Sequence, residues 1–124
     1  MTADAKQTLG KWGEERAVAQ LEGEGYAVLA RNWRKRGGEI DIIARSPAGV
    51  VCFVEVRTTR GTRFGGAAAS ITAAKRRKMA TVASQYLAET GGDAPARFDV
   101  IAHERRGGEW RTEHFEGAFM LEEP

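Results

Sequence analysis

The sequence GEIDIIARSPAGVVCFVEVRTT, residues 38–59, predicts a tight β-hairpin. Residues 39–45 and 50–58 alternate with a period of two and are rich in β-branched side chains, as strands are. Between them, Ser46-Pro47-Ala48-Gly49 has the residue types of a type I turn, and Gly49 suits the left-handed conformation that closes a three-residue loop. The hairpin is therefore expected to centre on Ala48.

A hairpin centred on Ala48 places Asp41 opposite Glu55, because both lie the same distance from the centre. Directly opposed residues project to one face with Cβ atoms about 4.5–5.5 Å apart, so two like charges meet. Such a pair needs a divalent cation, a raised pKa or a nearby positive charge. Arg57, two residues after Glu55 on the same face, supplies a positive charge.

Two interpretations of this acidic pair are open. One is a solvated polar face that carries a surface ion pair, and the other is a metal site. The neighbours on the same face, Ile43, Val51 and Phe53, are apolar. A fully solvated face would not carry them, which argues against the first interpretation.

Four blocks follow one another along the chain: Gly-x-x-Gly-Glu at residues 10–14 in a predicted helix, then GEIDIIA, FVEVR and RFDVIA. With these blocks, over roughly Leu9 to Ala102, the chain resembles the YraN family of uncharacterised proteins. That family is similar to archaeal Holliday-junction resolvases and shares the restriction-endonuclease-like PD-(D/E)xK nuclease fold. The resemblance implies an α/β fold with an αβββαβ core, a mixed central sheet flanked by helices, and here an extra C-terminal strand.

The resemblance also implies a metal-dependent nuclease that cleaves DNA phosphodiester bonds, on branched or single-stranded structures. In such a site Asp41 and Glu55 hold Mg²⁺ or Mn²⁺, with the backbone carbonyl of Val56 as a further ligand. Arg57 stands where the family signature has a lysine; it stays charged and steadies negative charge, but it cannot act as a general base. The alternative is a catalytically weak or inactive nucleic-acid-binding protein that retains the nuclease fold.

Glu14 and Glu39 are secondary candidates for the catalytic site. Helical spacing from about Thr8 to Glu24 places Glu14 on the apolar stripe, where a carboxylate needs a partner. The resemblance implies that Glu14 reaches the acidic pair, and the alternative is a glutamate that complements the helix dipole. Glu39 shares the face of Asp41 and is expected at the rim of the site.

The formal charge of +2 does not identify a nucleic-acid binder, so the distribution of charge matters. Basic residues cluster before the hairpin, after it, and at the start of a helix predicted from about Thr72 to Glu89. We expect the following residues to contact phosphates, with a solvated basic face as the alternative: Arg34, Lys35, Arg36, Arg60, Arg63, Lys75, Arg76, Arg77 and Lys78.

Two loops are predicted beside the site. Residues 32–37 form a basic loop in which Trp33 either stacks on a base or belongs to the core. Residues 59–69 are glycine-rich and form a mobile loop with Gly65 and Gly66 as its hinge. Outside the hairpin, strands are predicted at 26–31, 97–102 and 109–115. Asp99 is expected to have a structural role, and His103 and His114, near strand ends, are expected to be ordinary surface or edge histidines.

The length of 124 residues suits a single domain, 1–124, with residues 1–7 as a disordered tail. No apolar run approaches the roughly 18 residues that span a bilayer, and the first residues are polar, so we expect a cytoplasmic protein without a membrane span. Cys52 is the only cysteine, which excludes an internal disulfide. Related resolvases are dimers, so a homodimer is expected, although no heptad or apolar stripe specifies one.

Overall fold

The structure, a computed structural model, describes residues 2–60 and 71–119, with the backbone alone for residues 2–7. The elements are α1 (Thr2–Gly23), β1 (Ala27–Lys35), β2 (Gly38–Arg45), β3 (Val51–Thr59), α3 (Ala73–Glu89), β4 (Ala96–Arg106) and β5 (Glu109–Phe119). The strands form one sheet in the order β1-β2-β3-β4-β5, antiparallel except for the parallel pair β3 and β4. This is the predicted α/β fold, with a restriction-endonuclease-like core and an extra C-terminal strand.

The central hairpin has the predicted register. The amide of Gly49 donates to the Ser46 carbonyl at 2.9 Å, and Gly49 is left-handed with φ of 87°. The Ser46 hydroxyl also accepts a hydrogen bond from the Val50 amide at 3.0 Å. With the loop fixed in this way, Ile42 pairs with Val54, so the hairpin centres on Ala48 as the turn residues predicted.

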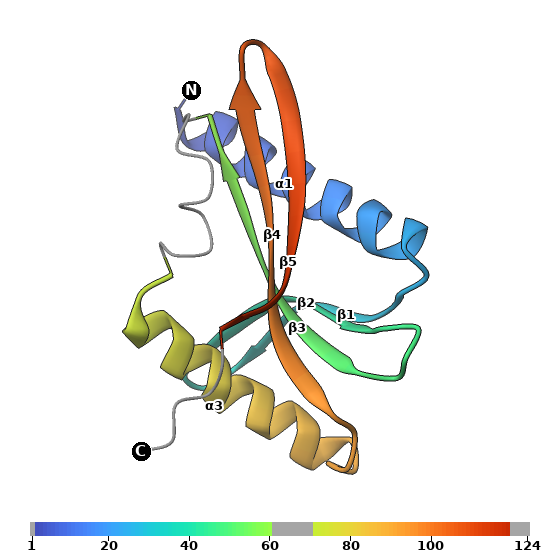
Figure 1. Cartoon of the computed structure of the whole chain (residues 1–124). Helices are drawn as coiled ribbons and strands as arrows, with labels where there is room; N and C mark the ends of the chain where they lie inside the picture. The colour runs from blue at the N-terminus through green and yellow to red at the C-terminus, as the bar shows by residue number, and fades with distance from the viewer. Residues whose placement is uncertain (1, 61–70, 120–124) are drawn as a thin grey trace.

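Helices α1 and α3 cover opposite faces of the sheet (Figure 1). On one face, Ala17 and Leu21 of α1 pack against alternate strand residues: Ile42, Ala44, Cys52, Val54 and Ile101. On the other face, α3 packs against the strand residues that lie between them: Ile40, Ile43, Val51, Phe53, Phe98 and Val100. The near-continuous apolar runs of β2 and β3 follow from this burial on both faces.

Helix α1 approaches the sheet most closely at Gly13. A Cβ atom there would overlap Thr58 Oγ1 and lie 3.2 Å from Thr58 Cβ. The Gly13 carbonyl is in turn 2.8 Å from Nε2 of the buried His103 on β4. Glycine at this position therefore lets α1 lie directly on β3, which brings the next residue, Glu14, toward the end of that strand.

The start of α1 and the end of β1 differ from the sequence prediction. Helix α1 begins at Thr2 rather than near Thr8, so the backbone of residues 2–7 is helical and not a tail. Strand β1 continues to Lys35, so the predicted basic loop at 32–37 is reduced to a two-residue turn in which Gly37 is left-handed with φ of 104°. Trp33 of this strand packs edge-to-face on Tyr86 of α3 at 5.2 Å between ring centres, which confirms its core assignment.

The loop predicted at 59–69, with its hinge at Gly65 and Gly66, lies largely outside the described residues, as does Arg63. Among the residues that the structure describes, no helix combines the length and apolar character needed to cross a bilayer.

Candidate metal centre

Asp41 and Glu55 lie where strands β2 and β3 separate. The last pair of their ladder is Ile42 with Val54, and the same register places Asp41 opposite Glu55 one step further. A continued ladder would pair Val56 with Ile40, but the Val56 amide instead donates to Asp41 Oδ2 at 2.9 Å. The Asp41 side chain thus replaces a backbone acceptor at the point where the two strands part.

The electrostatics of this pair are unfavourable to two negative charges. The Glu55 side chain is 8% exposed. Burial, and then the neighbouring Glu55 charge, raise the pKa of Asp41 to about 7, although the hydrogen bond from Val56 and the charge of Lys75 oppose the rise. Glu55 Oε1 is buried and has no hydrogen-bond partner in the described part of the chain. A positive charge placed between the carboxylates would relieve both the repulsion and the unpaired oxygen.

A cavity of about 680 Å³ opens onto the pair. It is bounded by α1 at Leu9, Gly10 and Glu14 and by the C-terminal half of β3, which presents Arg57 to it. Arg60, just beyond that strand, also lines the cavity. Two predicted site residues, Asp41 and Glu55, therefore share one cavity with two of the predicted cations.

Two cations approach Glu55 from different elements. Arg57 Nε lies 3.8 Å from Glu55 Oε2, and none of the described residues forms a hydrogen bond with this buried nitrogen. Lys75 Nζ, from the first turn of α3, lies 3.8 Å from Glu55 Oε1. Both distances are too long for hydrogen bonds, so the two cations flank the Glu55 carboxylate without forming hydrogen bonds to it.

Glu14 borders the cavity, as the sequence predicted, and contacts a residue that the sequence did not single out. Burial raises the pKa of Glu14, the charge of Asp41 adds to the rise, and a hydrogen bond with Asn32 opposes it. Asn32 falls between the pairs Arg31 with Ile42 and Trp33 with Ile40, which places it across from Asp41. It is left-handed, with φ of 49°, a conformation that asparagine tolerates better than most residues. An asparagine inside an otherwise strand-like stretch is the signal that would have pointed to it.

The residues present fit a hard divalent cation. The donors are the two carboxylates and the backbone carbonyl of Val56, a residue that lines the cavity; in a strand this carbonyl lies on the same edge as the Val56 amide, which faces Asp41. Mg²⁺ uses one or two carboxylates and keeps several waters, so this small oxygen set suits it. In the described part of the chain no three His, Cys, Asp or Glu side chains form a metal-binding group, so Glu14 is not a third ligand in this arrangement.

Glu39 is placed away from the cavity. Its carboxylate forms an ion pair with Arg34 at 3.0 Å, and it is not among the residues that line the cavity. Glu39 is therefore outside the cavity, although its charge still contributes to the raised pKa of Glu14.

The remaining predicted phosphate contacts divide into paired and exposed residues. Lys35 pairs with Glu89 at 3.1 Å and lies over the Trp33 ring. Arg76 donates to the Ile71 carbonyl at 3.2 Å. Arg36, Arg77 and Lys78 are exposed, the first in the β1–β2 turn and the others on α3.

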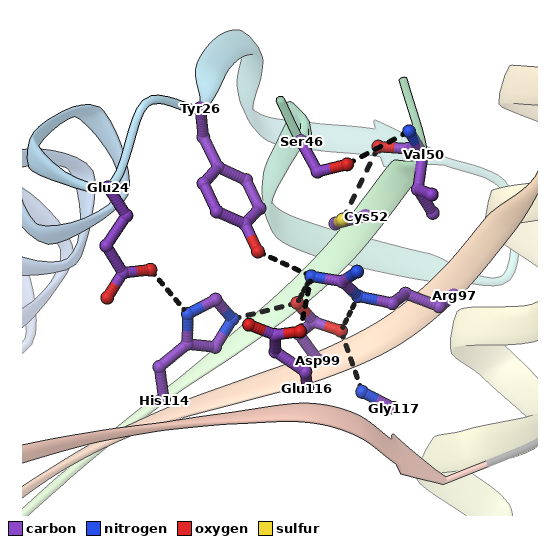
Figure 2. A network of polar contacts seen from close by, with 10 residues as sticks. All are labelled: Glu24, Tyr26, Ser46, Val50, Cys52, Arg97, Asp99, His114, Glu116 and Gly117. Carbon is purple, nitrogen blue, oxygen red and sulfur yellow. Dashed lines mark hydrogen bonds and ion pairs between the residues drawn. The ribbon is translucent and has the colours of Figure 1, made fainter. Parts of the chain in front are cut away.

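A second polar network lies apart from the cavity, on β4 and β5 (Figure 2). Its centre is Asp99, which is fully buried and accepts hydrogen bonds from Arg97 at 2.9 Å and from the Gly117 amide at 3.0 Å. Arg97 also donates to the Tyr26 hydroxyl. Burial opposes the charge of Asp99, but its hydrogen bonds from His114, Arg97 and Gly117 outweigh burial and lower its pKa. This network supports the structural role predicted for Asp99.

His114 links the network to α1 and is not the surface histidine that the sequence suggested. Its side chain is 5% exposed, with Nε2 at 2.8 Å from Asp99 and Nδ1 at 2.9 Å from Glu24. Burial disfavours the charged imidazole, but these two carboxylates more than compensate and raise the pKa of His114. Cys52, nearby in Figure 2, is buried, and burial raises its pKa to about 11, so it is not a reactive thiol.

Comparison with known proteins places the chain in a family. Residues 13–102 match the model of "Uncharacterised protein family UPF0102". The UPF0102 protein of Ralstonia pickettii is 49% identical over 86% of this chain and 88% of its own length. The corresponding proteins of Cupriavidus taiwanensis and Syntrophotalea carbinolica are each 46% identical, over 90% and 93% of this chain and 86% and 94% of their own lengths. The chain therefore belongs to the uncharacterised family UPF0102, the YraN family that its sequence motifs resemble.

Proposed function

We propose that this protein is a nuclease that uses a divalent metal ion to cleave DNA phosphodiester bonds. The observation that carries the proposal is the convergence of Asp41 and Glu55 in one cavity, with a Glu55 oxygen left unpaired. Two opposed carboxylates with little solvent around them repel each other when both are charged, and a divalent cation held between them would compensate for this repulsion.

Asp41, Glu55 and the Val56 carbonyl would hold Mg²⁺ or Mn²⁺. Bound there, the ion would polarise the phosphate and lower the pKa of a bound water. Asp41 has a second task, because its hydrogen bond from the Val56 amide fixes the strand edge on which the carbonyl lies.

The cations around the carboxylates suit an anionic substrate. Arg57 and Arg60 line the cavity, and the buried Nε of Arg57 has no hydrogen-bond partner among the residues that the structure describes. A guanidinium in this position would donate to a phosphate oxygen and steady the charge that develops during cleavage. Because arginine stays protonated, the proposal gives Arg57 no role as a base.

The test is cleavage of linear, flapped and four-way DNA by the purified protein with Mg²⁺ or Mn²⁺. Asp41→Ala and Glu55→Gln are expected to reduce cleavage by at least about 100-fold, because each removes a ligand of the ion. Glu109→Gln, which changes an exposed carboxylate at the start of β5, is the matched control and should cleave as the wild type does. Cleavage that persists in both site variants would show that another nuclease contaminates the preparation and would remove the support for the proposal.

A second candidate function is binding of nucleic acid without cleavage. The observation that favours it is Arg57 at the position where the family signature has a lysine. It predicts DNA binding that weakens steeply as salt rises, with no metal-dependent products from any substrate in the panel. The same samples used for the cleavage assay distinguish the two functions.

A further inference from the structure

Lys75 is positioned at the site by the start of helix α3. The Thr72 hydroxyl caps the helix and accepts a hydrogen bond from the Lys75 amide at 3.1 Å. From this first turn the side chain reaches Glu55, with Nζ at 3.8 Å from Oε1. The Lys75 side chain is 37% exposed, so its ammonium faces both the buried carboxylate and solvent.

The position of this lysine is not explained by the stability of the helix. A positive charge in the first turn opposes the helix dipole, and this first turn contains no acidic residue to offset it. Nor does Lys75 satisfy Glu55 by a hydrogen bond, because 3.8 Å is too long for one and Glu55 Oε1 has no hydrogen-bond partner within residues 2–60 and 71–119. The three N–H donors of the ammonium are therefore available to a further acceptor.

The charge balance of the site indicates which acceptor. Two carboxylates, Asp41 and Glu55, face two cations, Arg57 and Lys75, so the four side chains are neutral in sum when all are charged. A divalent ion held by the carboxylates would leave the cluster with two surplus positive charges. An anion bound beside the metal ion would reduce this surplus, and the phosphodiester of the substrate, which carries one negative charge, is that anion under the proposed function.

We infer that Lys75 supplies the amine of this site from helix α3, and that it binds a phosphate oxygen of the substrate while Arg57 approaches from β3. The inference rests on the proposed function. The amine that contacts the phosphate then comes from helix α3, whereas Glu55 lies on strand β3. A compact ammonium with rotatable donors then works beside a planar guanidinium, one at each oxygen of Glu55.

The first experiment measures Mn²⁺ binding by calorimetry and needs no cleavage. Lys75→Met is expected to bind Mn²⁺ about threefold to tenfold more tightly, because it removes a positive charge beside the ligands. Lys75→Arg, which keeps the charge, should restore the wild-type affinity. Arg45→Met, an exposed cation at the opposite end of β2, controls for the loss of one charge and should leave the affinity unchanged. Equal Mn²⁺ affinity in Lys75→Met and the wild type would overturn the placement of the ammonium.

The second experiment measures DNA affinity in Ca²⁺ and turnover in Mn²⁺ for the same variants. Lys75→Met is expected to bind DNA about tenfold more weakly in Ca²⁺ and to lose at least about 30-fold in turnover, with partial recovery in Lys75→Arg. A purely structural role for Lys75 would instead weaken Mn²⁺ binding along with turnover. If the wild type fails to cleave, the proposed function fails, whereas the inference fails if Lys75→Met binds DNA in Ca²⁺ as tightly as the wild type.

Discussion

The Asp41 carboxylate accepts a hydrogen bond from the Val56 amide at 2.9 Å, in the place where the β2–β3 ladder would have continued. One side chain thus ends the pairing of two strands and also presents its charge to Glu55. The fold keeps the two carboxylates together although their charges repel each other, and burial and the Glu55 charge raise the pKa of Asp41 to about 7. The charged form of Asp41 therefore lowers the stability of the folded protein.

Asp41→Asn is expected to stabilise the fold at pH 8 while abolishing metal-dependent cleavage. The pKa of Asp41 is higher in the folded protein than in the unfolded chain, so the wild type loses stability as pH rises from about 4 to about 7. Asparagine keeps an oxygen for the Val56 amide and carries no charge, so a gain of about 1–2 kcal/mol in unfolding free energy is expected at pH 8. Urea unfolding at pH 5 and pH 8 measures this change.

Glu24→Gln is a control that is expected to change the unfolding free energy at pH 8 in the opposite direction to Asp41→Asn. Burial opposes the charge of Glu24, but the hydrogen bonds from His114 and Gln20 outweigh it and lower its pKa, so removal of this charge should destabilise the protein at pH 8. A loss of stability in Asp41→Asn at pH 8 would contradict the electrostatic account of the acidic pair.

His114 is expected to make stability depend on pH in the network of Figure 2. Its raised pKa means that its contribution is complete below pH of about 6.5 and is lost as pH rises through the folded-state value. The imidazole contacts Glu24 in the turn after α1, Asp99 of β4 and the ring of Tyr26. Beyond Asp99, the network continues to Arg97 of β4 and Glu116 of β5.

His114→Gln therefore should lower the unfolding free energy by about 1–2 kcal/mol at pH 5.5 and by less at pH 9. Thermal unfolding of both proteins across this range measures the difference. A difference that is constant with pH would show that the imidazole contributes through packing alone.

Gly13→Ala is expected to destabilise the protein by about 1–3 kcal/mol, because the new methyl group has no room between α1 and β3. It should also reduce cleavage, since Glu14 and the adjoining cavity wall move with the helix. Gly10→Ala, in the same helix with nothing within 4 Å of a new Cβ, is expected to stabilise by about 0.5–1 kcal/mol. Chemical unfolding of the two variants should shift in opposite directions, and a shift of Gly13→Ala to higher stability would contradict the close approach.

Arg57→Lys tests which element supplies the amine. If Lys75 already binds the phosphate, a second lysine on β3 only removes the forked donors of Arg57, and turnover should fall about threefold to tenfold. Single-turnover cleavage at saturating Mn²⁺ measures this effect. An increase in turnover would instead show that the arginine on β3 limits the reaction and that Lys75 does not replace the signature lysine.

Local chemistry explains why the centre of the site could be predicted from sequence. The Ser46 to Gly49 loop allows one hairpin register, and that register alone sets Asp41 opposite Glu55. The extent of strand β1 was harder to predict from sequence. Asn32 is left-handed and the pairing with β2 shifts between Val28 and Ala30, so the two-residue alternation of side chains is interrupted although the strand continues.

Contacts between distant segments were not predictable in the same way. Lys75 reaches Glu55 because of where α3 crosses the sheet, and a single sequence does not specify that crossing. His114 meets Asp99 only because β4 and β5 shift register between Phe98 and Val100, and it meets Glu24 only because α1 ends nearby. Residue spacing along the chain carries no signal for either arrangement.

The most direct test of the acidic pair as a metal site is the anomalous diffraction of a crystal soaked in Mn²⁺. One peak is expected within roughly 2.0–2.6 Å of oxygens from both Asp41 and Glu55, and it should be absent in Asp41→Ala crystals soaked in the same way. A well-ordered soaked crystal with no peak between these carboxylates, or with Mn²⁺ bound only elsewhere, would contradict the account.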